Sequence, residues 1–173
     1  MSESDRIDVH IVVDDALIDD LDVLAVIDPV WWTANIYDGP AKYTESLARF
    51  SVAQRLVNAV VWYHSEVNNG GHEQFFGNST GIVWVDALEG FETFGPVGAG
   101  DILREAIERL GGSPSLDRGE RNDQMDRLGV EFDDLDDRYY DLGDEIGDRA
   151  ARFIQSNRDQ FYFSGIVRKP KGL

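Results

Sequence analysis

Carboxylates are the side chains most able to do chemistry in this sequence, and they gather in residues 131–148. This segment holds nine Asp or Glu residues and one base, Arg138, so its net charge is −8 over 18 residues. Two kinds of chemistry use such a segment. Carboxylate oxygens bind hard cations such as Mg²⁺, and closely spaced carboxylates can also accept hydrogen bonds from Arg and Lys in place of nucleic-acid phosphates.

The metal interpretation depends on Asp133, Asp134 and Asp137, which fit the Asp-Asp-x-x-Asp pattern that binds Mg²⁺ and diphosphate in isoprenoid synthases. Any Asp-rich helix produces this match, and no basic cluster accompanies it to receive a diphosphate. His64 and His72 are eight residues apart across an Asn-Asn-Gly-Gly turn, outside the usual spacing of helical metal ligands. We therefore predict no enzyme, metal or cofactor, and keep a metal-dependent enzyme that uses the Asp cluster or the polar turn as an alternative.

The phosphate-like interpretation depends on helical periodicity in residues 131–156. Five apolar residues share an arc of about 80° on a helical wheel, and these are Phe132, Leu135, Tyr139, Leu142 and Ile146. The acidic residues of the opposite arc are Asp133, Asp134, Asp137, Asp141, Asp144, Glu145 and Asp148. We predict one continuous helix with about one net charge per 3.4 Å of axis, the linear density of phosphates on one DNA strand. Asp136 lies nearer the apolar arc, so we expect it to be an internal partner of an arginine.

A second acidic patch is predicted near the N-terminus. From residue 14 to residue 28 the leucines follow a helical period, and the opposite face carries Asp15, Asp19 and Asp22. We expect Pro29 to end this helix.

Length and composition limit the number of domains, the kinds of site and the location that we expect for this protein. The chain has 173 residues, 33 Asp and Glu against 16 Lys and Arg, and a formal charge of −17. A hydrophobic share of 42% is sufficient for a core, so we predict one domain over residues 1–173. The absence of Cys excludes disulfides and thiolate zinc sites. The charge argues against direct nucleic-acid binding, and because no apolar run approaches 18 residues, we expect a cytoplasmic protein without a membrane span.

The coarse order of elements is mainly α-helical. Residues 1–13 are predicted as an extended or strand segment, and residues 157–173 as a basic tail. A largely buried helix is expected over residues 44–67, with Thr44 as its N-cap and a polar stripe that includes Gln54 and Asn58. Shorter helices are expected over residues 72–76, 82–93 and 97–110. The fold class that follows is a single compact multi-helix domain with one short N-terminal strand.

The segment from Glu66 to Phe76 reads EVNNGGHEQFF and is followed by Asn78 and Ser79. It resembles the DNA mimic protein family, an acidic bacterial family, and the match extends from about residue 54 to residue 161. Many members have an aromatic or aliphatic residue where His72 stands here. The resemblance implies a mainly α-helical domain, a homodimer in the studied branch, and surface carboxylates that imitate duplex phosphates on the DNA-binding face of a helix-turn-helix transcription regulator.

We interpret the polar motif as structural rather than catalytic. Asn and Gly tolerate the left-handed conformation of a helix end, so Gly70 and Gly71 are expected to form a tight turn. Asn68, Asn69 and Gln74 are expected to satisfy backbone groups near it. The structural motif residues are Gln54, Asn58, Asn68, Asn69, Gly70, Gly71, Gln74, Phe75 and Phe76.

These observations predict a DNA mimic that binds a basic DNA-binding protein, a helix-turn-helix regulator, and competes with DNA. One alternative is an acidic structural or regulatory protein without mimicry. Asp outnumbers Glu 22 to 11 and Arg outnumbers Lys 13 to 3, which also suits a salt-adapted proteome in which acidity serves solubility.

Overall fold

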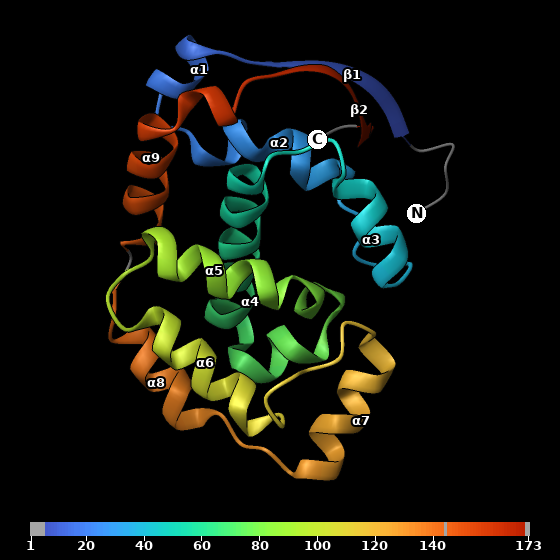
Figure 1. The fold of residues 1–173 in the computed structure, drawn as a ribbon, viewed down its shortest axis with the longest axis vertical. Helices are drawn as coiled ribbons and strands as arrows, with labels where there is room; N and C mark the ends of the chain where they lie inside the picture. Colours follow the sequence, from blue (N-terminus) through green and yellow to red (C-terminus); the bar gives the residue numbers. More distant parts are fainter. Residues whose placement is uncertain (1–5, 144, 172–173) are drawn as a thin grey trace.

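The computed structural model describes residues 6–143 and 145–171. In those residues the chain forms nine α-helices, two short 3-10 helices and two strands (Figure 1). Their bounds are β1 Arg6–Val13, α1 Asp15–Asp19, α2 Val23–Thr33, α3 Pro40–Leu47, α4 Val52–Gly77, η2 Ser79–Val83, α5 Trp84–Phe94, α6 Ala99–Arg109, α7 Arg118–Leu128, α8 Asp133–Tyr140, α9 Ile146–Ser156, η3 Arg158–Gln160 and β2 Phe163–Pro170. The mainly helical class and the N-terminal strand are confirmed.

The two strands form an antiparallel pair across one end of the molecule (Figure 1). Val9 lies opposite Val167, and one face of the ribbon buries Val13 and Val167. Strand β2 lies inside the stretch that the charge pattern marks as a basic tail. Lys169 of β2 contacts the carboxylate of Asp28 in α2 at 2.6 Å, so part of the tail charge is used within the protein.

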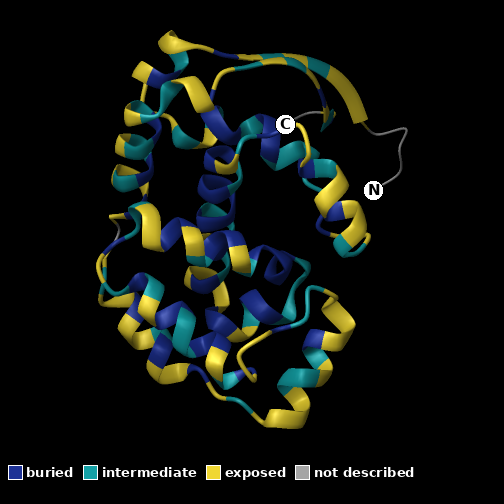
Figure 2. Ribbon diagram, viewed as in Figure 1, coloured by how far each residue is buried: buried dark blue, intermediate teal, exposed yellow. Residues whose placement is uncertain are grey.

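Helix α4 runs through the middle of the molecule and contributes more buried residues than any other described element (Figure 2). The predicted start at Thr44 is wrong, because residues 40–47 form the separate helix α3. Ser51 is the N-cap of α4 and forms a capping box with Gln54, in which each side chain accepts from the backbone N–H of the other residue. A capping box satisfies two N–H groups that a helix start leaves free, which explains the start at this residue.

The first acidic segment forms two helices and does not end at Pro29. Asp14 caps α1 and Asp22 caps α2, and Leu21 between them takes a left-handed conformation with φ of 60°. Pro29 lies inside α2 and is buried. A proline there removes one helical hydrogen bond, and burial of the apolar neighbours Ile27 and Val30 offsets that loss.

The predicted continuous acidic helix over residues 131–156 is wrong. It is two helices, α8 and α9, separated by Gly143 with φ of 70°. Glycine adopts this conformation without the steric cost of a Cβ atom, so it interrupts the helical period. The seven carboxylates therefore do not share one axis, and Asp144 lies outside the described residues.

Helix α7 was not predicted, and its anchor is the fully buried Arg121. The guanidinium donates to the carbonyl oxygens of Phe76, Asn78 and Ser115 at 2.6, 2.7 and 2.7 Å. Burial lowers the pKa of Arg121 to about 10, so the side chain is still a cation at neutral pH. Arg121 thus joins α7 to the C-terminal end of α4.

We expect Arg121→Leu to lower the free energy of unfolding by at least about 3 kcal/mol, because it leaves several buried carbonyl oxygens without a donor. Urea unfolding followed by circular dichroism measures this. Arg127→Leu, an exposed position of the same helix, is the matched control and should change stability little. Equal midpoints for the two variants would contradict the role of Arg121.

Candidate functional site

Three of the predicted carboxylates form a row along α8. Asp133, Asp137 and the C-cap residue Asp141 are exposed and follow one another at intervals of four residues, about 6 Å of helix axis. None of the three forms an ion pair with another residue in the described ranges. We call these residues the α8 row.

Three other predicted carboxylates of this region contact the protein's own arginines. Asp134 binds Arg109 at 2.6 Å, which lowers the pKa of Asp134 to about 2. Glu145 binds Arg149 at 2.9 Å. The pair of Asp148 with Arg152 is longer, at 3.7 Å, and both side chains are highly exposed.

Two carboxylates of the N-terminal patch also form ion pairs with an arginine of the protein. Arg158 donates to Asp15 at 3.1 Å and to Asp19. The Tyr162 hydroxyl donates to Asp15 at 2.8 Å, and this bond, followed by that of Arg158, lowers the pKa of the Asp15 carboxyl. Asp22 accepts from the backbone N–H of Ala25 as the cap of α2.

The elements that carry the acidic residues follow one another along one side of the molecule. In Figure 1, α1 lies above α9, and α8 lies below it on the same side. Helix α1 contacts α9, and α8 lies farther toward the opposite end of the molecule (Figure 1). The helices that carry the two acidic patches therefore lie along one long side of the molecule, although they are far apart in the sequence.

An ion-pair network, missed from the sequence, fixes α8 on α6. Glu105 accepts from Arg109 at 2.7 Å and from Arg138 at 2.6 Å, while Arg109 also binds Asp134. Arg138 and then Arg109 lower the pKa of Glu105. The four-residue spacing of Glu105 and Arg109 was the available signal, whereas the contact with α8 depends on tertiary packing.

The glycine motif interrupts α4 without ending it. Gly70 and Gly71 have non-helical backbone angles, with φ of 72° and ψ of −176° at Gly71, and the helix continues to Gly77. Asn68 donates to the backbone oxygen of His64 at 2.9 Å. Asn69 and Gln74 do not serve backbone groups as expected, because Asn69 donates to the side chain of Gln74.

Glu66 accepts hydrogen bonds from three polar side chains in and after the motif. Its carboxylate accepts from Gln74 at 2.6 Å, Asn78 at 3.0 Å and Thr80 at 2.9 Å. These bonds tie α4 to the start of η2. A carboxylate that accepts three hydrogen bonds is held as a structural group.

A buried chain of polar groups crosses the break in α4. His72 is fully buried, and its Nδ1 contacts Oδ1 of Asp136, which also accepts from the backbone N–H of His72 at 2.8 Å. On the other side, Nε2 lies 2.5 Å from the Tyr63 hydroxyl. A carboxylate only accepts, so Nδ1 carries the proton and Nε2 accepts from Tyr63. Asp136 is an internal partner as expected, but of His72 and not of an arginine.

The remaining motif residues lie in the core. Phe75 and Phe76 are fully buried and pack edge to face at a centroid distance of 4.9 Å. Gln54 reaches the backbone oxygen of Phe161 at 3.4 Å. The Asn58 side-chain oxygen is buried and has no hydrogen-bond partner within the described part of the chain.

The described residues contain neither a candidate metal site nor a helix that could cross a membrane. Across residues 6–143 and 145–171, no group of three or more His, Asp or Glu side chains could hold a metal ion. In the same ranges no helix has the length and apolar character that crossing a membrane requires.

Comparison with protein families matches residues 48–157 to the model described as DMP19-like protein. The chain belongs to this family. The matched range begins just before α4 and ends after α9, so it contains the glycine motif, Glu66, the buried His72 chain and the α8 row. Searches of curated proteins and of solved structures returned no match.

We expect Gly71→Ala to lower the free energy of unfolding by at least about 2 kcal/mol. A Cβ atom at this positive φ would lie 2.2 Å from Oδ2 of Asp136. Gly147→Ala is the control, since nothing lies within 4 Å of a Cβ atom there, and it should stabilise helix α9 by about 0.5–1 kcal/mol. Thermal and urea unfolding test both, and a harmless Gly71→Ala would refute the packing of Asp136 against the break.

The buried His72 also predicts a pH dependence. Burial lowers the pKa of His72 despite the opposing effect of Asp136, so below about pH 6.5 the unfolded chain binds a proton that the native chain does not. Stability therefore falls as the pH decreases from 6.5 toward the native pKa, by up to about 1.4 kcal/mol per pH unit. His72→Gln should be less stable at pH 7.5 and lose this slope, whereas exposed His10→Gln should keep it. Parallel pH profiles for wild type and His72→Gln would contradict the prediction.

Proposed function

We propose that this protein is a DNA mimic that binds a basic DNA-binding protein, a helix-turn-helix transcription regulator, and blocks its binding to DNA. The observation that carries the proposal is the α8 row, three exposed carboxylates that lie in the family-matched range. Each carboxylate would accept from an Arg or Lys that otherwise contacts a phosphate. This activity belongs in the cytoplasm, where the regulator and its DNA meet.

The charge of the whole chain supports an encounter with a cationic partner. A formal charge of −17 produces a long-range field that speeds association with a basic surface and weakens as salt rises. The edge formed by α1, α9 and α8 would present the acidic residues along the long axis of the molecule (Figure 1). The contact region would include Asp134, Glu145, Asp148, Asp15, Asp19 and Asp22 beside the α8 row, together with Asp144.

The internal ion pairs divide these residues into two groups. A carboxylate held by its own arginine, such as Asp134 or Asp19, gives up that bond or shares it when a partner arrives. The α8 row needs no such exchange. We therefore expect the α8 row to supply the larger part of the binding free energy. The paired residues would supply a smaller part that is more sensitive to salt.

The same ion pairs also support the alternative function, an acidic interaction protein without mimicry. Carboxylates that bind Arg109, Arg149 and Arg158 stabilise the protein itself. Their acidity would then serve folding and solubility. DNA competition separates the two functions, because only mimicry requires the partner to use its DNA-binding face.

The test starts with a pull-down from native lysate and salt-stepped elution. Basic DNA-binding proteins should elute as salt rises, and duplex DNA added in place of salt should release them. Asp133→Asn with Asp137→Asn should weaken capture about tenfold or more, because two charge-assisted contacts are lost. The control is Asp123→Asn with Asp126→Asn on α7, which removes the same charge from exposed residues of another helix.

Folding should survive in both double variants, since all four residues are exposed. Equal losses in the two variants would mean that only net charge matters. Capture that duplex DNA does not reverse would reject mimicry and favour the alternative function.

We also propose that the protein acts as a homodimer, as the resemblance implies. Size-exclusion chromatography with light scattering measures the mass directly. A monomer of 19.4 kDa at high protein concentration would rule the dimer out.

A further inference from the structure

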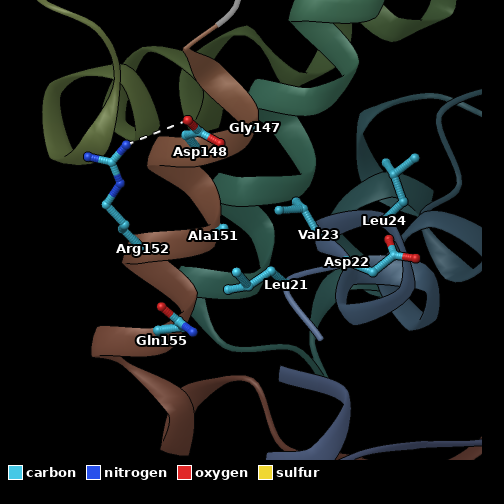
Figure 3. A pocket seen from close by; sticks show the side chains of 9 residues that line it. All are labelled: Leu21, Asp22, Val23, Leu24, Gly147, Asp148, Ala151, Arg152 and Gln155. Carbon is cyan, nitrogen blue, oxygen red and sulfur yellow. Dashed lines mark ion pairs between the residues drawn. The ribbon is translucent and has the colours of Figure 1, made fainter. Parts of the chain in front are cut away.

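A hollow of about 530 Å³ lies between the turn that joins α1 to α2 and helix α9 (Figure 3). Its apolar part comes from Leu21, Val23 and Leu24 on one side and Ala151 on the other. Figure 3 shows Leu21 and Val23 projecting toward α9. The hollow brings the two acidic patches together, because Asp22 and Asp148 both lie on its rim.

Both leucines that line this hollow are largely exposed. Leu21 is 53% exposed and Leu24 is 60% exposed. Leu21 also has the left-handed backbone angle that Gly and Asn adopt at lower cost. An apolar side chain at this position gains little from the protein's own core.

A second hollow, of about 780 Å³, begins at the same Leu24 and continues over α2 to α4. It is lined by Trp31, Trp32 and Val61, with His64 and Asn68 at its polar end. Leu24 therefore stands between two apolar hollows. Together they form a surface that follows the exposed face of α2.

The charges around this surface determine which partner fits. Asp20 and Asp22 flank Leu21 in the sequence and are exposed, and Asp148 lies across the first hollow. The rim also holds one cation, Arg152, which pairs loosely with Asp148. Apolar side chains surrounded by carboxylates complement a segment that carries leucine-like residues on one face and Lys or Arg beside them.

We propose that the two hollows beside Leu24 are a docking surface for a cationic amphipathic helix, whose apolar side chains enter the hollows while its Lys and Arg side chains contact Asp20, Asp22 and Asp148. This inference rests on the proposed function and adds an apolar anchor to it. A partner held by carboxylates alone would be selected by charge. A partner that also fills the hollows is selected by the spacing of its apolar residues.

The test uses two synthetic 14-residue peptides of equal charge. One carries Leu at i, i+3, i+4 and i+7 spacing along one helical face and Lys on the opposite face, and the other has Ser in place of every Leu. Titration calorimetry at 0.15 M salt should show at least tenfold tighter binding of the Leu peptide. Because Trp31 and Trp32 line the second hollow, the Leu peptide should also change the intrinsic tryptophan fluorescence, whereas the Ser peptide should not.

The decisive variant is Leu21→Asn with Leu24→Asn. Asn tolerates the backbone of residue 21, so the variant should fold, and it should bind the Leu peptide no better than the Ser peptide. The control Val85→Asn with Val97→Asn replaces exposed apolar residues elsewhere and should keep the tenfold preference. Equal binding of the two peptides, or an unchanged preference in the Leu variant, would overturn the inference.

The outcome is separable from that of the proposed function. Loss of DNA competition in Asp133→Asn with Asp137→Asn concerns the α8 row, which is not part of the hollows. If the peptide preference persists while duplex DNA releases no captured protein, the docking surface stands and mimicry fails. A preference that disappears only when the protein is concentrated would show that a second copy occupies the surface, and would overturn the inference as well.

Discussion

The contact between Asp136 and the break in α4 is the interaction on which the rest of the structure depends. Gly71 leaves space for the carboxylate, and His72 supplies both a backbone N–H and a ring nitrogen to it. A partly buried carboxylate is stable only when its oxygens are hydrogen-bonded. Because Asp136 belongs to α8, this contact fixes how α8 lies on the core and therefore which of its other carboxylates point outward.

Arginines form ion pairs with some of the described acidic residues and leave others without an ion pair. Arg109 and Arg138 hold α8 to α6 through Glu105 and Asp134, and Arg158 holds α1 to the C-terminal region. Like charges on adjacent helix turns repel one another, so these pairs reduce a cost that a chain of −17 would otherwise carry. The three carboxylates of the α8 row have no arginine partner within the described residues.

The proposed function depends on surfaces of two kinds. The α8 row would offer charge alone, which would give a fast but salt-sensitive encounter. The hollows beside Leu24 would offer apolar contact, which would give selectivity among basic partners. In this proposal, encounter with the partner takes place at α8 and discrimination among partners takes place beside α2.

The sequence by itself determined the helical class, the first strand, the break at Gly70 and Gly71, and the exposure of Asp133, Asp137 and Asp141. These features depend on local signals: the period of apolar residues, alternation in a strand, and the backbone freedom of glycine. Tertiary structure alone decided that residues 163–170 pair with β1 and that Asp136 binds His72. It also decided which carboxylates find an arginine, since Asp15 and Arg158 are 143 residues apart and meet only because the folded core brings their elements together.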